Sequence, residues 1–305
     1  MNRISRLKLL PGLVLLVLVV LLSGMSVMAQ DDKANQAKKL YNDGIKAMQE
    51  GKPDVAIIAY KGAITNDPDY VDAYLNLGAI YFEQKKYDDA LEMFRTAVDK
   101  DEKNVDAWAN IGRVESVLRR SVEAQTAYET ALSIDPKNGQ ILKELGKVLY
   151  TRGQYPDAVE KLKQCHDNGA GDNVSYYMLG KAYEKMDQTD NAIAALKKSI
   201  ELKNNYYGSH SALGSIYLAQ EKYLPAAKEF KAALKAAPKR GYLAAYNYAV
   251  AMEQHNQDDL DANIANWEAY IKIAKNIPKA KDGLEIARSH VKELKDRKAA
   301  LANEL

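Results

Sequence analysis

Glycine recurs along the chain at a fixed interval of 34 residues, and this spacing constrains the fold more than any other feature of the sequence. The six registered positions are Gly44, Gly78, Gly112, Gly146, Gly180 and Gly214. A fixed period of this length is typical of stacked repeats, in which each unit contacts only its neighbours. Because glycine inside a helix costs about 1 kcal/mol relative to alanine, a chain that keeps it in six places needs it for close packing.

Two further positions repeat in register with the glycines. Twelve residues after each glycine stands an alanine: Ala56, Ala90, Ala124, Ala158, Ala192 and Ala226. Sixteen after it stands a large ring or leucine: Tyr60, Phe94, Tyr128, Leu162, Leu196 and Phe230. Apolar residues at three- and four-residue steps predict that each half-unit is an amphipathic helix. We expect the glycine to let the second helix approach the first, with the alanine as its small counterpart. The bulky residue is expected to fill the groove towards the next unit.

This pattern resembles the tetratricopeptide repeat, whose 34-residue period carries a Trp-Leu-Gly-Tyr-Ala-Phe-Pro signature. In the second unit the match runs through residues 74–81 (Tyr-Leu-Asn-Leu-Gly-Ala-Ile-Tyr) and continues at Ala90, Phe94 and Ala97. The resemblance covers roughly residues 36–278 and implies an all-α solenoid of antiparallel helix pairs. It also implies that the pairs coil into a right-handed superhelix whose first helices line the concave face.

The repeats weaken towards the C-terminal end of the chain. Residues 36–278 hold about seven units, six regular and a seventh degenerate, in which Tyr248 stands at the glycine position and the ring arrives six residues late as Tyr270. Residues 279–305 are predicted to form a C-terminal capping helix with one apolar stripe, made of Leu284, Ala287, Val291 and Leu294. A stack of repeats needs such a cap to stay soluble. The same stripe is also suited to a homodimer.

Residues 1–29 are predicted to be a signal peptide. A basic start precedes a run of ten apolar residues, Leu13 to Leu22, and Val27-Met28-Ala29 offers small side chains where a signal peptidase cleaves. The alternative is an uncleaved signal anchor, because the 21 uncharged residues 9–29 are about enough to cross a bilayer. Residues 30–35 would then be a short linker. Both interpretations predict an exported protein, either periplasmic or secreted, or anchored in the inner membrane by residues 9–29.

The charge after the targeting segment is balanced. Beyond residue 30 there are 40 basic and 41 acidic side chains, a net charge of −1. A near-neutral chain has no broad basic field for nucleic acid, so no nucleic-acid partner is expected.

Nothing in the sequence indicates catalysis, a metal or a cofactor. The four histidines, which are His166, His210, His255 and His290, are scattered, and none pairs with cysteine or a second histidine at metal-ligand spacing. The single cysteine, Cys165, falls on a small core position, so burial is expected and no disulfide can form within these 305 residues. The sequon Asn173-Val174-Ser175 is interpreted as incidental. We therefore expect a protein that is not an enzyme and has no cofactor.

Binding in such a stack falls to first-helix residues two before, one after and five after each glycine, because these spacings share a helical face. We call them the groove positions. Two before the first three glycines stand Asn42, Asn76 and Asn110. A carboxamide is both donor and acceptor, so a ladder of them can clamp an extended peptide of any sequence. The asparagine ladder in the superhelix of the O-linked N-acetylglucosamine transferases looks similar, although asparagine is common at this place throughout the repeat family.

Basic residues occupy the next groove position in the middle units, at Arg113, Lys147 and Lys181. Such groups can receive acidic side chains or a C-terminal carboxylate from a partner. The alternative is ordinary solvation of helix surfaces, with Glu144 and Glu184 partly neutralising the set. The carboxylate clamp seen in some of these repeats does not transfer, because Ile45 stands where it needs asparagine.

The sequence thus favours an interaction scaffold of the bacterial cell envelope that holds a partner's peptide or helix in the groove. The alternative within this class is an assembly factor of a secretion, pilus or polysaccharide-export machine. A different class is a structural element that self-associates through the helix of residues 279–303. A glycan-binding protein that stacks sugars on Tyr150 and Tyr177 is a third.

Overall fold

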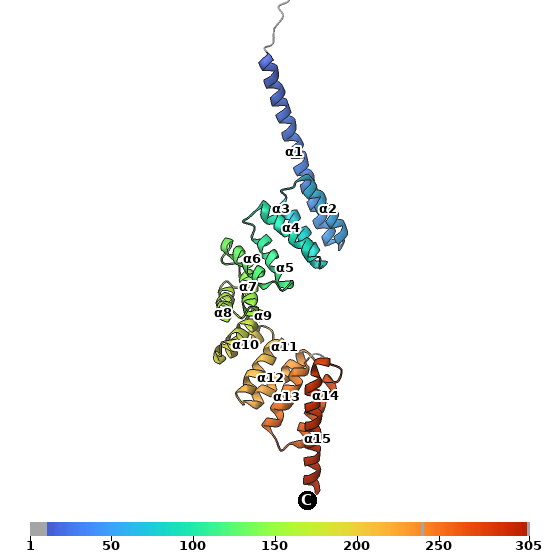
Figure 1. Cartoon of the computed structure of the whole chain (residues 1–305), viewed down its shortest axis with the longest axis vertical. Coiled ribbons are helices and arrows are strands. Elements are labelled where there is room, and N and C mark those ends of the chain that lie inside the picture. Colours follow the sequence, from blue (N-terminus) through green and yellow to red (C-terminus); the bar gives the residue numbers. More distant parts are fainter. Residues whose placement is uncertain (1–10, 239–240, 304–305) are drawn as a thin grey trace, which may run out of the picture. The chain divides into compact units, whose positions relative to one another are not determined.

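The computed structural model describes residues 11–238 and 241–303, with side chains from residue 30 onward. These residues form fifteen α-helices and one short 3₁₀ helix, with no strand among them (Figure 1). The chain divides into two compact units, Met1–Asp135 and Pro136–Leu305. The expected all-α architecture of helix pairs is confirmed.

The first unit holds three helix pairs. Its helices are α1 (Pro11–Gln49), α2 (Pro53–Asn66), α3 (Val71–Glu83), α4 (Tyr87–Lys100), α5 (Val105–Val117) and α6 (Ser121–Ile134). Each odd-numbered helix packs against the even-numbered helix that follows it. Residues 30–35 lie inside α1, where the sequence analysis expected a linker. This segment contains neither proline nor glycine, so the backbone has no reason to leave the helix.

The second unit holds four helix pairs and the capping helix. Its elements are α7 (Gly139–Thr151), α8 (Tyr155–Asp167), α9 (Asn173–Lys185), α10 (Thr189–Leu202), α11 (Tyr207–Ala219), α12 (Tyr223–Ala236), α13 (Tyr242–His255), α14 (Leu260–Ala274), the 3₁₀ helix η1 (Pro278–Ala280) and α15 (Lys281–Asn303). The pairs repeat the arrangement of the first unit, and α15 packs against α14.

The six regular pairs share one turn of three residues whose middle residue is left-handed. That residue is Gly51, Lys85, Arg119, Gly153, Asp187 or Glu221, with φ between 57° and 77°. A backbone bond closes each turn, as where Lys86 N donates to Tyr81 O at 2.8 Å. This bond belongs to the Schellman motif that ends many helices. Two of these turns have glycine at this position, Gly51 and Gly153, and the other four keep the same geometry without glycine.

The registered glycines make the close approach that the sequence predicts. A β-carbon at Gly112 would lie 2.7 Å from the nearest ring carbon of Tyr128, and one at Gly146 would lie 2.7 Å from Leu162. The bulky side chain therefore covers the glycine of its own pair. The same side chain also shares a buried cluster with the first helix of the next pair: Leu196 clusters with Leu213, and Phe230 clusters with Ala244. The expectation that it packs towards the next unit therefore agrees with the structure.

Replacing Gly112 by alanine is expected to lower the free energy of unfolding by about 1–2 kcal/mol, since overpacking costs about 1–3 kcal/mol and the better helix propensity of alanine offsets part of it. Tyr128 is buried and cannot swing away. Urea denaturation followed by circular dichroism measures the change. The matched control is Gly62→Ala, whose β-carbon would meet only a methyl of the half-buried Leu40 at 3.1 Å. Equal destabilisation by the two variants would contradict the packing role of Gly112.

The second helix of the seventh pair begins three residues later than the 34-residue period requires. The expected shift, from the position of Tyr270, was six residues. Leu260, at the start of α14, lies 37 residues after Tyr223, at the start of α12, against 34 residues between Thr189 and Tyr223. The ring position therefore falls on Trp267, 37 residues after Phe230. Tyr270 was the wrong choice because it is buried elsewhere. Its hydroxyl lies against Gly283 of α15, where no side chain intervenes.

The capping helix buries the stripe that the sequence predicts. The buried residues of α15 are Leu284, Ala287, Val291 and Leu294. They belong to a buried cluster that also contains residues of α14. Lys295 Nζ pairs with Glu268 at 2.8 Å and adds a polar contact between α15 and α14. A homodimer through this stripe would have to displace α14.

The signal-peptide or anchor prediction falls on residues 1–10, which lie outside the described residues, and on 11–29, whose side chains do too. In the part of the chain that the structure describes, no helix combines the length and the apolar character needed to span a membrane.

Candidate functional site

A cavity of about 430 Å³ lies between the first helices α1 and α3 of the first unit. Five of the six groove positions of these two helices line it: Ile45, Gln49, Asn76, Ala79 and Glu83. The remaining walls are mostly apolar or aromatic, at Tyr41, Met48, Tyr60 and Ile80. The cavity thus combines an apolar lining with a carboxamide and a carboxylate, which is how sites for peptide segments are commonly built.

One residue of the asparagine ladder, Asn76, lines this cavity, whereas Asn42 and Asn110 do not. Asn76 is half-buried, and its Nδ2 donates to the hydroxyl of Tyr41 in the preceding pair at 2.9 Å. Asn42 is exposed on α1, and Asn110 is half-buried on α5. Since Asn76 uses one N–H in this bond, its amide retains a second N–H and the carbonyl oxygen for a ligand.

Arg113 lies over the preceding pair as well. Its Nη2 is 3.4 Å from Glu83 Oε1, and its guanidinium stands 4.1 Å from the ring centroid of Phe82. The side chain is half-exposed. Arg113 thus contacts the preceding pair through a cation–π interaction as well as an exposed ion pair.

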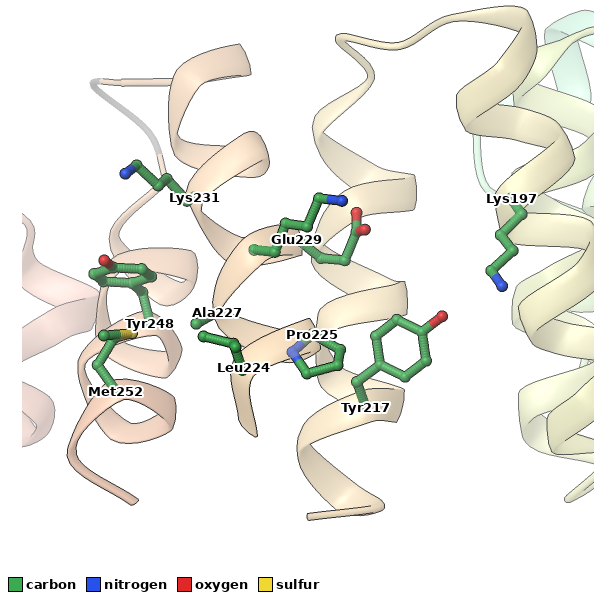
Figure 2. A pocket seen from close by; sticks show the side chains of 10 residues that line it. Lys197, Tyr217, Leu224, Pro225, Ala227, Glu229, Lys231, Tyr248 and Met252 are labelled. Carbon is green, nitrogen blue, oxygen red and sulfur yellow. The ribbon is translucent and has the colours of Figure 1, made fainter. Parts of the chain in front are cut away.

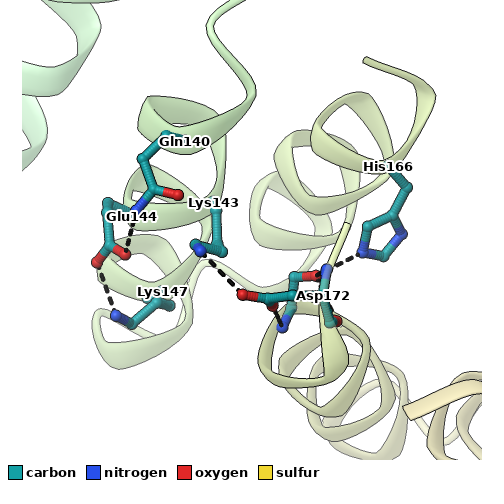
Figure 3. A network of polar contacts seen from close by, with 7 residues as sticks. Gln140, Lys143, Glu144, Lys147, His166 and Asp172 are labelled. Atoms are coloured by element: carbon teal, nitrogen blue, oxygen red, sulfur yellow. Dashed lines mark hydrogen bonds and ion pairs between the residues drawn. The ribbon is translucent and has the colours of Figure 1, made fainter. Parts of the chain in front are cut away.

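The two groove lysines of the second unit, Lys147 and Lys181, are also paired, and Figure 3 shows the pair that Lys147 makes. Lys147 Nζ lies 2.6 Å from Glu144, which accepts a second bond from Gln140, and Lys181 Nζ lies 2.5 Å from Glu184. The neutralisation that the sequence analysis considered as an alternative is therefore present for both lysines.

Lys143 is the most buried of the basic residues near the groove positions. It is 13% exposed and contacts Asp172 at 3.0 Å. Although burial opposes it, the hydrogen bonds from Ser175 and Lys143 lower the pKa of the Asp172 carboxyl. Asp172 also caps α9 through the backbone N–H of Ser175, so this ion pair fixes the start of a first helix.

Glu115 is a site residue that the repeat pattern did not reveal. Its side chain is 2% exposed on α5, three residues after Gly112, where the other six units have Ala47, Tyr81, Leu149, Tyr183, Tyr217 and Ala251. Arg95 lies 3.2 Å and Arg120 3.3 Å from its two oxygens. An acid at a position otherwise filled by alanine, leucine or tyrosine is a signal that the sequence carries. Glu115 and Arg95 line a cavity of about 470 Å³ between α4, α5 and α6.

Several titratable and aromatic groups serve the packing of the repeats. Cys165 is buried as predicted, and burial raises the pKa of its thiol. Burial lowers the pKa of His166, which stacks on Tyr176 with centroids 3.7 Å apart. Tyr150 and Tyr177, the candidates for sugar stacking, each pack against another tyrosine.

No cluster of three or more histidine, cysteine, aspartate or glutamate side chains suited to a metal ion occurs among the described residues. Ser175 of the sequon is buried beneath the His166 ring nitrogen, which lies 3.0 Å from its Oγ. The sequon is thus built into the start of α9.

Comparison with known proteins identifies the repeat. Family models of the tetratricopeptide repeat match residues 47–114, 110–173, 174–206 and 207–240. The DnaJ homolog subfamily C member 3 of Bos taurus is 32% identical over 95 residues, 31% of this chain. The match spans 19% of that relative's length.

Two solved structures share the architecture. YrrB, described as a tetratricopeptide-repeat protein with an unusual peptide-binding site, covers 64% of this chain and 99% of its own, with 19% identity and a TM-score of 0.54. PilW, described as a type IV pilus biogenesis factor, covers 71% of this chain and 97% of its own, with 20% identity and a TM-score of 0.60. At this identity both show the fold alone. The family matches cover more than half of the chain, and the glycines within them lie against the bulky side chain of their own pair. This chain therefore belongs to the tetratricopeptide-repeat family.

Proposed function

We propose that this protein is an exported scaffold of the bacterial cell envelope that holds an extended peptide or a helix of a partner against its first helices. The repeat fold is typical of non-catalytic interaction scaffolds. The observation that carries the proposal is the cavity between α1 and α3, which five groove positions line. The peptide-binding site described for YrrB supports it by analogy.

The binding mechanism follows from the rigidity of the stack. Asn76 is already oriented by Tyr41, so its amide is held ready to bond to a peptide backbone. Binding therefore costs this chain less side-chain entropy than a freely rotating amide would lose, and the partner bears most of the entropy cost of ordering. Asn42 and Asn110 extend the ladder to either side of Asn76.

Arg113, Lys147 and Lys181 are proposed as contacts for acidic groups of the partner. Each already faces a glutamate, with between 23% and 50% of its own side chain exposed. Ion pairs at this exposure contribute only about 0–1 kcal/mol, so a partner carboxylate can replace the glutamate at little cost.

The second candidate is an assembly factor of an envelope machine for secretion, pilus formation or polysaccharide export. The specific support is the likeness to PilW, a pilus biogenesis factor. Residues 1–29 would deliver either kind of protein across the inner membrane, and an uncleaved segment 9–29 would tether it there.

Crosslinking in the cell, followed by purification of the full chain and mass spectrometry, tests the proposal. The groove variant carries Asn76→Ala, Asn110→Ala and Arg113→Glu. We expect it to lose a partner that the native chain captures, while circular dichroism shows that the variant remains folded. Cell fractionation of the same samples is expected to place the chain in the envelope.

The matched control carries Asn168→Ala, Asn191→Ala and Lys163→Glu, which are exposed residues of the second unit outside the groove positions. It makes the same charge change and should keep the partner. Retention of every partner by the groove variant would show that the first-helix face is ordinary repeat surface.

A further inference from the structure

A larger cavity, of about 730 Å³, surrounds the beginning of α12 in the second unit. Tyr248 and Met252 of α13 lie on one side of Leu224 and Ala227, and Tyr217 of α11 lies on the other (Figure 2). None of the lining residues occupies a groove position. This surface is therefore distinct from the one proposed above.

The floor of this cavity, which we call the α12 pocket, is apolar and accessible. Leu224, the second residue of α12, is 54% exposed. Tyr217, Tyr248 and Met252 are half-buried around it. Tyr248 stands where the six regular units have glycine, so its ring adds apolar surface that no other pair has. Tyrosine and methionine pack well against an incoming apolar side chain.

The rim of the α12 pocket is basic. Lys197, Lys228 and Lys231 line it and are exposed. The only acid in the lining, Glu229, is already engaged, because His210 Nδ1 lies 2.6 Å from its Oε2. This hydrogen bond raises the pKa of His210. The pocket thus offers three positive charges and no acid without a partner.

These lysines differ from the basic residues of the groove. Arg113, Lys147 and Lys181 each pair with a glutamate. Across residues 30–238 and 241–303, no carboxylate lies within ion-pair distance of Lys197, Lys228 or Lys231. Their positive charge is therefore available to a ligand.

The local sequence shows the same bias. Six of the seven second helices carry an acid in their first turn: Asp54 in α2, Asp88 and Asp89 in α4, Glu123 in α6, Asp157 in α8, Asp190 in α10 and Asp261 in α14. The first turn of α12 has none and presents leucine and proline in their place. The α12 pocket is thus the place where the repeat exchanges a negative surface for an apolar one with a positive rim.

We propose that the α12 pocket docks an acidic segment of a partner protein that carries an apolar side chain. The apolar residue of the segment packs on Leu224, Tyr217 and Tyr248, and its flanking carboxylates face the three lysines. Three lysines on a chain that is otherwise balanced in charge fit a short acidic peptide better than a nucleic acid. This surface would let the scaffold hold a second partner while the groove is occupied.

A fluorescein-labelled peptide in which Leu-Phe is flanked by aspartates is the probe. Its anisotropy is measured with the full-length chain, kept in a mild detergent because of the apolar residues 9–29. We expect saturable binding that weakens with added salt, because exposed charges are screened. Peptides with lysine in place of aspartate, or alanine in place of Leu-Phe, should bind about tenfold more weakly or worse.

Two variants locate the binding. Lys228→Glu combined with Lys231→Glu should weaken binding of the acidic peptide by about tenfold, and so should Leu224→Asp. The matched control combines Lys163→Glu with Lys203→Glu. Lys163 is exposed on α8 at the repeat position of Lys231, and Lys203 is exposed after α10. The control should bind the peptide as the native chain does. Circular dichroism of each variant verifies the fold.

Three results would overturn the proposal. The first is equal affinity for the acidic and the lysine-substituted peptides. The second is equal loss of binding in the lysine variant and its control. The third is binding of phosphatidylserine vesicles through Lys228 and Lys231 without binding of the peptide, which would make the surface a membrane contact. The groove variant leaves the α12 pocket intact, so failure here and failure of the proposed function are separately visible.

Discussion

Replacing Trp267 by alanine should lower the free energy of unfolding of the C-terminal helices by about 3–5 kcal/mol, the range for a large buried ring. Trp267 is 1% exposed and joins three helices. Its indole N–H donates to Glu253 of α13 at 2.9 Å, and its ring stacks on His290 of α15 with centroids 5.1 Å apart. The substitution would therefore loosen α13, α14 and α15 together. Amide hydrogen exchange of these helices is the measurement, because it reports the stability of one part of a repeat array.

Two further variants separate the causes of this loss. Trp267→Phe keeps an aromatic ring but removes the N–H bond to Glu253, and we expect it to cost less than alanine does. Trp108→Ala in the first unit removes the other tryptophan, which is only half-buried, and should leave exchange in α13–α15 unchanged. If Trp267→Ala left the rates of amide hydrogen exchange in these helices unchanged, the ring would not be the link between the capping helix and the repeats.

Replacing Glu115 by leucine should stabilise the first unit or leave it unchanged, whereas Glu115→Ala should destabilise it by about 1–3 kcal/mol. The equivalent residue of the next pair, Leu149, shows that this repeat position accepts leucine in the core. The arginines that face Glu115 are 62% and 49% exposed, so both remain hydrated when the carboxylate is gone. Alanine leaves a space in the core and also removes the ion pairs.

Urea denaturation of the two Glu115 variants gives the comparison. A gain of up to about 4 kcal/mol for leucine would be in the range measured when buried ion pairs are replaced by apolar residues. If leucine destabilised the unit as much as alanine does, the paired carboxylate would be a net source of stability. The double replacement Arg95→Ala and Arg120→Ala would then be expected to lower the free energy of unfolding by as much as Glu115→Ala does.

The repeat was predictable because the residues that recur with its period each have a strict steric role. Gly112 and Tyr128 fix the contact between two helices, so their spacing reveals the pair. The degenerate seventh pair was harder to place. Trp267 and Tyr270 are both aromatic and both buried, and only the start of α14 at Leu260 shows which of them takes the ring position.

The candidate site was predictable in its register and less so in its contacts. Of the predicted site residues, Asn76 lines the cavity between α1 and α3, and Asn42 does not. The bond from Asn76 to Tyr41 and the stacking of Arg113 on Phe82 were not foreseen, because Tyr41 and Phe82 stand outside the groove positions of the preceding pair. The buried Glu115 broke the pattern visibly, and a column-by-column comparison of the units would have found it.

Because each bulky side chain covers the glycine of its own pair, the central steric match of the fold is made between residues only sixteen apart in the chain. A pair of helices carries this match with it wherever it stands in the array. Duplication or deletion of one such helix pair would leave the glycine contact of every other pair intact. It would disturb only the interfaces with the neighbouring pairs on either side. The length of the array is thus free to change in evolution by whole segments, while the specialised pair that contacts the capping helix stays fixed at its end.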